Sequence, residues 1–300
     1  MTIREILDDI KSKRKKKVIL DTDAYNEIDD QYAIAYSYYC DRLDILCACA
    51  EPFHHDHKES MELGMEKSYD EIKRVLSLCD PDHNIPVFKG SRTTVSEAGG
   101  MVESDAADAI IKYVRESDEI VYVLAIGAIT NVISAVMKAP DIKENMCVIW
   151  LGCNELRLSD CPVEFNLHMD FKGGQELFES QVPLVLCPAN FVTGGLTAPI
   201  EKFRELKDTT PIGHYLWDIT EKRYYMMGAY EGWLRTIWDL GAPTVLDIPE
   251  TIEFDVVRAP ILTSERTFAF DDSRHEIIIV KSYDREAVYD KAWKLIKKEI

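Results

Sequence analysis

Short runs of β-branched and aliphatic residues alternate along the chain with longer segments whose apolar positions recur every three or four residues. The short runs have the length of buried strands, and the longer segments have the period of amphipathic helices. The predicted strands cover residues 17–21, 44–50, 85–88, 119–126, 147–151 and 182–187. The predicted helices cover residues 29–40, 58–78, 104–116, 129–138 and 172–179. This alternation predicts an α/β fold with an open, doubly wound, mostly parallel sheet and helices on both faces.

The last third of the chain has a different pattern. Residues 210–240 carry aromatic side chains at near-helical spacing, which predicts a long helical stretch. Two β-like runs follow at residues 251–257 and 276–280, and residues 284–298 have the pattern of a closing helix. No internal repeat, low-complexity segment or long Pro/Gly/Ser linker divides the sequence, so we expect a single domain over residues 1–300.

Composition narrows the classes of protein and partner. The chain has 300 residues, 46% of them hydrophobic, and a formal net charge of −18, which disfavours binding to nucleic acid polymers. The basic run at residues 13–17 is the local exception, and we interpret it as the solvated end of a helix before the first strand. No run approaches the ~20 apolar residues of a membrane span, so we expect no membrane association.

The cysteine pattern and the first ten residues indicate the cellular compartment of the protein. The eight cysteines show no C-x-x-C spacing, and several lie in predicted strands, so reduced and mostly buried thiols are expected. The first ten residues are acidic where a signal peptide would be basic and then apolar. Both observations lead us to expect a cytoplasmic protein.

An acidic cluster follows the apolar run Val18-Ile19-Leu20. It consists of Asp21-Thr22-Asp23 and Asp29-Asp30. Carboxylates this close repel one another unless a cation or protons neutralise them. Hard oxygen ligands suit calcium or magnesium, and the lack of a matching His or Cys set argues against zinc. Ligands of open α/β sheets gather at the carboxyl ends of the strands, where Ile126 and Asn154 also fall.

Taken with three further motifs, the acidic cluster resembles the inosine/uridine-preferring nucleoside hydrolase family. The motifs are residues 124–131 (LAIGAITN), Glu164-Phe165-Asn166 and Trp238-Asp239, and they occur in the family's order over nearly the whole chain. The resemblance implies a divergent member with a nucleoside hydrolase-like fold. It implies a calcium-dependent hydrolase of the N-glycosidic bond of ribonucleosides or related N-ribosides, releasing ribose and free base. It also implies a small-molecule substrate and a homo-oligomer, either dimer or tetramer.

The resemblance also assigns individual residues. It makes Asp23, Asp30 and Asp239 calcium ligands, together with the backbone carbonyl of Ile126. The catalytic residues are then Asp23, as general base toward the attacking water, with Asn166 and Trp238. The substrate-binding candidates are Asp29, Asn154, Glu164, Asn166, His168 and Tyr225.

Two departures from the family's pattern affect this assignment. Residues 24–28 make the loop between Asp23 and Asp29 two residues longer than in the family, so we expect Asn26 or Glu27 to reach the site. Trp238 stands where purine-accepting members carry a histidine, and tryptophan can stack on a base but cannot protonate it. The candidates for protonating the leaving base are His168, Tyr224, Tyr225, Tyr230 and Glu231, with His54 and His55 from the loop after the second strand.

Two other functions stay open at this stage. Residues 18–23 also resemble the strand-end motif of haloacid dehalogenase-type phosphohydrolases, in which Asp21 is the nucleophile and Asp23 the acid, with magnesium. That interpretation needs a later acidic pair, for which Asp271-Asp272 is the candidate, and it leaves Asp29-Asp30 unexplained. The other alternative is a non-catalytic nucleoside or sugar binder on the same site. A retained general base favours the hydrolase.

Overall fold

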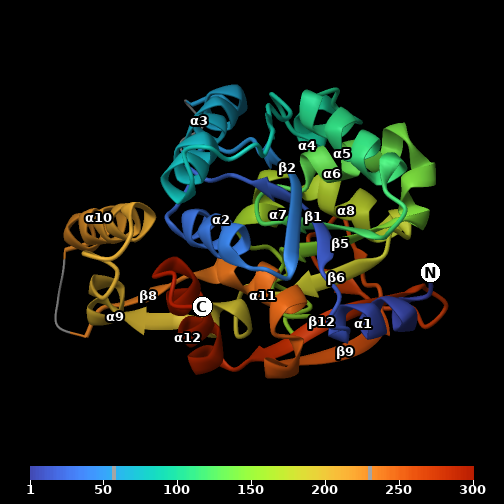
Figure 1. Cartoon of the computed structure of the whole chain (residues 1–300). Coiled ribbons are helices and arrows are strands. Elements are labelled where there is room, and N and C mark those ends of the chain that lie inside the picture. The colour runs from blue at the N-terminus through green and yellow to red at the C-terminus, as the bar shows by residue number, and fades with distance from the viewer. Residues whose placement is uncertain (56–58, 229–231) are drawn as a thin grey trace.

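An eight-stranded sheet forms the centre of the protein in this computed structural model, which describes residues 1–55, 59–228 and 232–300 (Figure 1). The strand order is β3-β2-β1-β4-β5-β6-β12-β9. Neighbouring strands run parallel except for β9, which pairs antiparallel with β12 at one edge. The predicted open, mostly parallel α/β sheet is confirmed.

The strands of this sheet are β1 (Lys16–Thr22), β2 (Leu43–Ala50), β3 (Val87–Phe88), β4 (Val121–Ala125), β5 (Met146–Leu151), β6 (Leu184–Cys187), β9 (Ile252–Arg258) and β12 (Glu276–Tyr283). Two short hairpins are β7 (Thr197–Pro199) with β8 (Leu234–Thr236), and β10 (Ile261–Leu262) with β11 (Phe268–Ala269). The α-helices are α1 (Ile3–Lys11), α2 (Asp29–Tyr39), α3 (Met61–Cys79), α4 (Val95–Ala98), α5 (Asp105–Glu116), α6 (Thr130–Lys138), α7 (Phe165–Met169), α8 (Phe171–Ser180), α9 (Ile200–Arg204), α10 (Pro211–Met226), α11 (Gly241–Asp247) and α12 (Arg285–Ile296). The 3-10 helices are η1 (Pro140–Glu144), η2 (Thr193–Gly195), η3 (Trp238–Leu240) and η4 (Pro249–Thr251).

Two apolar cores lie on the two faces of the sheet. Successive side chains of a strand point to opposite faces, so Leu20 joins the core shared with α2, α3, α11 and α12. Its neighbour Ile19 joins the core shared with α5, α6 and α8. All six residues of β5 are buried, as expected for a strand covered by helices on both sides. The sheet is therefore doubly wound, as the sequence predicts.

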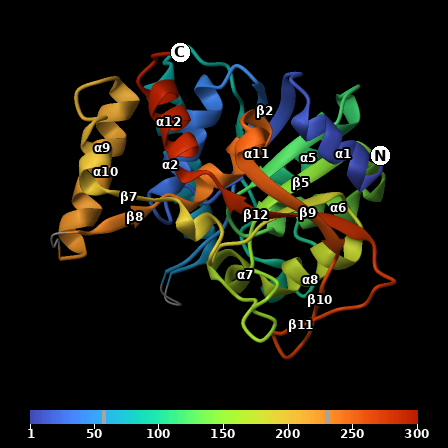
Figure 2. The ribbon, with the colours of Figure 1, turned by 90° about the horizontal axis from the view of Figure 1, so that it is seen from below.

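The predicted long helix over residues 210–240 is only half correct. Helix α10 ends at Met226, and residues 234–236 form β8, which pairs with β7. Gly228 and Gly232 both have a positive φ, a conformation that glycine adopts at little cost and that ends the helical pattern. Both views show α9, α10, β7 and β8 together beside the main sheet (Figure 2).

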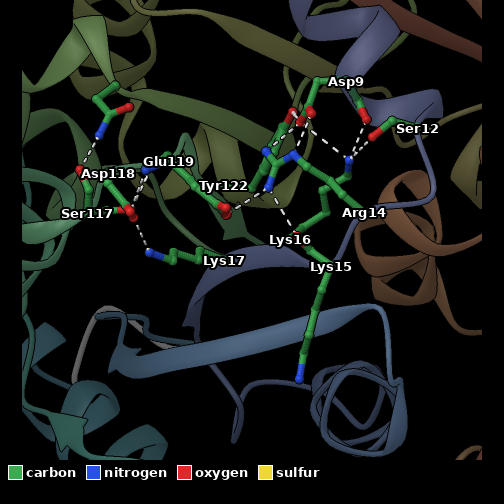
Figure 3. Close-up of polar contacts among 11 residues, drawn as sticks. Asp9, Ser12, Arg14, Lys15, Lys16, Lys17, Ser117, Asp118, Glu119 and Tyr122 are labelled. Carbon is green, nitrogen blue, oxygen red and sulfur yellow. Dashed lines mark hydrogen bonds and ion pairs between the residues drawn. The ribbon is translucent and has the colours of Figure 1, made fainter.

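The basic run at residues 13–17 is not simply solvated, and that prediction is wrong at Lys16. The Lys16 side chain is completely buried, and its ammonium donates to the carbonyl of Asp9 and, at 2.6 Å, to the hydroxyl of Ser12 (Figure 3). Arg14 and Tyr122 also bind the Asp9 carboxylate, at 2.7 and 2.6 Å. These contacts connect α1 to β1 and β4. They lie at the amino ends of these strands, opposite the carboxyl ends. Burial lowers the pKa of Lys16 to about 8.

The structure also bears on the expectations about membrane spans and cysteines. No helix within the described ranges is long and apolar enough to cross a membrane. All eight cysteines are free thiols, and seven are buried, whereas Cys161 is exposed.

Candidate active site

A cavity of about 270 Å³ opens where the carboxyl ends of β1, β4 and β5 meet the segment around η3. Residues from seven segments of the described sequence come together there, because parallel strands present their carboxyl ends at one edge. The predicted site residues that line the cavity are Asp23, Asp29, Asp30, Ile126, Glu164, Asn166, Trp238 and Asp239.

Four buried carboxyl groups form the floor of this cavity. Asp29, Asp30 and Asp239 each place an oxygen within 4.8 Å of the others, and Asp23 lies close enough to raise the pKa of Asp239. Burial, and then the neighbouring carboxylates, raise the pKa of Asp23 and of Asp239 well above the ordinary value. Burial raises the pKa of Asp29 to about 6 and that of Asp30 to about 8. A cation bound among these oxygens would favour the charged form of each group.

The first loop and helix position the carboxylates contributed by the N-terminal part of the chain. Asp29 and Asp30 lie in the first turn of α2, where the helix dipole favours negative charge. The Thr22 hydroxyl at the end of β1 donates to Asp30. The side-chain amide of Asn26 donates to Asp23 at 2.9 Å, so the longer loop reaches the site as predicted.

The loop after β4 passes close to Asp23. A Cβ atom on Gly127 would lie 3.1 Å from the Asp23 carboxyl group, so a larger residue there would require Asp23 to shift slightly. Ile126 lines the cavity, and its carbonyl accepts a hydrogen bond of 3.3 Å from the Asn166 amide. That amide also donates to the carbonyl of Leu151 at 2.9 Å. Asn166 therefore ties the ends of β4 and β5 together at the edge of the cavity.

Glu164 acts as the N-cap of α7. One of its oxygens accepts from the backbone of Cys153 at 2.9 Å and of Leu167 at 2.7 Å, and the other accepts from the backbone of Asn166 at 2.7 Å. Cys153 adopts a positive φ of 64°, unusual for a residue with a side chain, and its N–H makes one of these bonds. Glu164 thus holds Asn166 in place in addition to lining the cavity.

Three predicted substrate-binding residues do not line the cavity. Asn154 is buried beneath it and accepts a hydrogen bond of 2.6 Å from Asn190, which does line it. His168 is exposed on α7, and Tyr225 is 68% exposed at the end of α10. We therefore no longer assign substrate contacts to these three residues.

The structure shows which candidates for the leaving-group acid line the cavity. His55 lines the cavity, whereas His54 and Tyr224 do not. Tyr230 and Glu231 lie outside the described residues. His55 is therefore the candidate that the described part of the chain brings to the site.

Glu27 reaches the site, as the longer loop predicts, but its two arginine partners could not be assigned from sequence. Glu27 lines the cavity and accepts hydrogen bonds from Arg223 at 2.6 Å and Arg235 at 2.8 Å. Arg235 also lies 3.6 Å from Asp29, and its guanidinium lies 5.3 Å from the centroid of the Trp238 ring. Arg235 carried no recognisable signal, because its acidic partners Glu27 and Asp29 are more than 200 residues earlier in the chain.

Asp21 lies behind the site and does not line it. It is fully buried, accepts a hydrogen bond of 2.9 Å from Asn131, and faces the buried carboxyl group of Glu51. Burial raises the pKa of Asp21 to about 6 and that of Glu51 well above its ordinary value. A phosphohydrolase would need Asp21 as an accessible nucleophile, and its other acidic pair, Asp271-Asp272, is exposed. The haloacid dehalogenase alternative is therefore not supported.

The sequence model described as inosine-uridine preferring nucleoside hydrolase matches residues 18–290. The chain belongs to this family. Solved nucleoside hydrolases have the same fold at low identity. A plant nucleoside hydrolase shares 18% of residues with a TM-score of 0.76, over 94% of this chain and 99% of that one. An inosine-uridine preferring nucleoside hydrolase from Bacillus anthracis shares 15% with a TM-score of 0.70, over 94% and 99%.

A purine-preferring ribonucleoside hydrolase from Gardnerella vaginalis shares 20% of residues with a TM-score of 0.74, over 94% of this chain and 98% of that one. A comparison with curated protein sequences found no match. The expectation of a divergent member of the nucleoside hydrolase family is confirmed.

Proposed function

We propose that this member of the nucleoside hydrolase family hydrolyses the N-glycosidic bond of ribonucleosides or related N-ribosides, with calcium bound at the cavity floor. The observation that carries the proposal is the convergence of four buried carboxyl groups with Asn166 and Trp238 in one cavity. Cleavage of a ribosyl C–N bond builds positive charge on the sugar, and buried anionic groups beside the ring stabilise that charge.

The donor set suits a hard divalent cation. Its oxygens belong to carboxylates, and Asp29, Asp30 and Asp239 already stand within 4.8 Å of one another. Asp23, Asp30, Asp239 and the Ile126 carbonyl would hold the ion. A bound calcium ion would lower the pKa of a ligated water and bind ribose hydroxyls. Asp29 is as close to this cluster as Asp30, so it is a further possible ligand as well as a ribose contact.

The side chains then have distinct roles in the proposed reaction. Asp23 takes a proton from the attacking water as general base. Asn166, held by two backbone carbonyls and by the cap that Glu164 forms, orients the ribose. Trp238, beside Asp239, forms a wall of the cavity against which a base can stack. Correct orientation matters, because small displacements of reacting groups cost large factors in rate.

The test is an assay for free base and ribose with inosine, adenosine, guanosine, uridine and cytidine as substrates. It is run with calcium, after chelation, and after calcium is restored. Equal amounts of ribose and base, formed only with calcium, support the proposal. Nucleoside binding by calorimetry without product formation would instead indicate the non-catalytic binder. A homo-oligomer and a cytoplasmic location stay predictions.

A further inference from the structure

The cavity has a buried floor and a more exposed mouth. Asp23, Asp30 and Asp239 on the floor are each at most 3% exposed. Phe165 is 38% exposed, and His55 is also exposed, yet both line the same cavity. If the ribose binds at the carboxylate floor, as in the proposed function, the base of the nucleoside must point toward the mouth.

His55 makes one hydrogen bond and two ring contacts at that mouth. Its Nε2 lies 2.8 Å from the carbonyl oxygen of Asn26. A carbonyl oxygen only accepts hydrogen bonds, so Nε2 carries the hydrogen. The imidazole ring also packs against Phe53, with centroids 5.5 Å apart, and Phe165, with centroids 6.2 Å apart. The contact with Asn26 occupies Nε2, and Nδ1 makes no hydrogen bond to any residue in the described ranges, so Nδ1 is the ring nitrogen that we assign to the ligand.

Glu27, Asn190 and Trp238 are less suited to give a proton to a departing base. Both oxygens of Glu27 accept from arginines, Arg223 on one side and Arg235 on the other. The Asn190 amide donates to Asn154. The indole N–H of Trp238 is a hydrogen-bond donor that does not release its proton near neutral pH. An imidazole can both donate and accept a proton in catalysis, so the His55 side chain suits proton transfer at the mouth.

We propose that His55 is the catalytic residue that protonates the departing base, a role that rests on the proposed hydrolase function. As the C1′–N bond breaks, its electron pair passes to the base nitrogen, and the base takes a proton from Nδ1 of the His55 imidazolium. The water oxygen bonds to C1′, and the proton of that water passes to Asp23. Solvent returns a proton to His55 and removes one from Asp23, so ribose and the neutral free base are the products.

The experiment compares two substrates in the calcium-loaded protein. One is the nucleoside that the wild type cleaves best, and the other is 4-nitrophenyl β-D-ribofuranoside, whose leaving phenolate needs no protonation. His55→Ala and His55→Gln should each lower kcat for the nucleoside about a hundredfold, the usual size of a general-acid contribution. Both variants should keep the wild-type kcat for the nitrophenyl riboside.

His214→Ala is the matched control. His214 is also exposed and also binds a backbone carbonyl, that of Lys207 at 2.7 Å, but it lies on α10 and does not line the cavity. It should leave both rates unchanged. The His55 assignment is overturned if His55→Ala cleaves nucleosides normally, if both substrates slow equally, or if His55→Gln restores the rate. A wild type that cleaves neither substrate would overturn the hydrolase proposal itself, and the role of His55 with it.

Discussion

Nδ2 of Asn26 lies 2.9 Å from Oδ2 of Asp23. The backbone N–H of Asn26 also donates to the carbonyl of Asp23 at 2.7 Å, and its own carbonyl binds His55. The loop that departs from the family's pattern is therefore folded into the site. One residue of this loop connects the proposed general base to the proposed acid.

Replacing Asp23 by Asn should lower kcat about a hundredfold or more, because the amide keeps the shape of the carboxylate but cannot take a proton. The metal-free variant should be at least as thermally stable as the wild type, since burial and neighbouring carboxylates penalise the charge on Asp23. Steady-state kinetics and thermal unfolding measure the two effects. Asp255→Asn, at an exposed position of β9, is the control. Near-normal turnover in Asp23→Asn would refute its role as base.

Calcium should stabilise the protein more at about pH 8 than at about pH 5.5. Burial raises the pKa of Asp29 to about 6 and that of Asp30 to about 8, above the ~3.9 of an unfolded chain. The metal-free folded state thus holds extra protons, and this contribution to stability is lost as pH rises through these values. Bound calcium replaces those protons and removes the loss.

Thermal unfolding with and without calcium at both pH values measures this difference. Asp239→Asn should reduce the calcium-dependent rise in Tm at both pH values, since Asp239 belongs to the same cluster. An equal or larger calcium effect at the lower pH would contradict the assignment of these carboxyl groups to the metal.

Arg235→Met should raise KM about tenfold or more, with a smaller change in kcat. Arg235 is 7% exposed, binds Glu27 and lies beside Asp29 and Trp238, so its loss leaves a buried carboxylate without its counter-charge. Removing a buried hydrogen bond to a charged group costs roughly 1.5–3 kcal/mol. Arg258→Met, on the exposed edge strand, is the matched control. An unchanged KM would show that Arg235 does not position the substrate-binding groups.

The wild type should gain stability relative to Lys16→Met as pH rises from about 7 to about 10. Burial lowers the pKa of Lys16 to about 8, whereas an unfolded lysine titrates near ~10.4. Between these values the unfolded chain binds the extra proton, so the free energy of unfolding increases with pH. Urea unfolding of both proteins across this range gives the difference. Lys13→Met, at an exposed position, should show no such trend. A constant difference for Lys16→Met would contradict the predicted titration.

The sheet and the acidic floor could be predicted from sequence because their signals are local. The apolar run that forms β5 needs no knowledge of its neighbours, and Asp23 follows directly from the end of β1. Ligands bind at the carboxyl ends of parallel strands, which indicates where the site lies. The order of the family's motifs then assigns Asp239 to the same site as Asp23. The same reasoning failed where aromatic spacing continued past Met226, since the β7–β8 pairing depends on a distant segment.

The surroundings of the floor could not be predicted, because they are made by pairs far apart in the chain. Glu27 meets Arg235 across 208 residues, and Asn154 meets Asn190 across 36. Lys16 appeared to belong to a solvated basic run, yet it is fully buried and its ammonium contacts Asp9 of α1. Glu51 follows the end of β2, but nothing in the sequence indicated that it faces Asp21. A run of charged residues or an isolated acidic residue shows which side chains are present, but it does not show which distant residue each one contacts.

The most direct test of the account is a calcium titration of the metal-stripped protein, with ribose release from inosine and uridine as the readout. We predict that activity is absent without metal, rises with added calcium and saturates when one ion is bound per chain. Ribose release that does not depend on calcium would contradict the account. So would stoichiometric calcium binding with no release from any nucleoside tested.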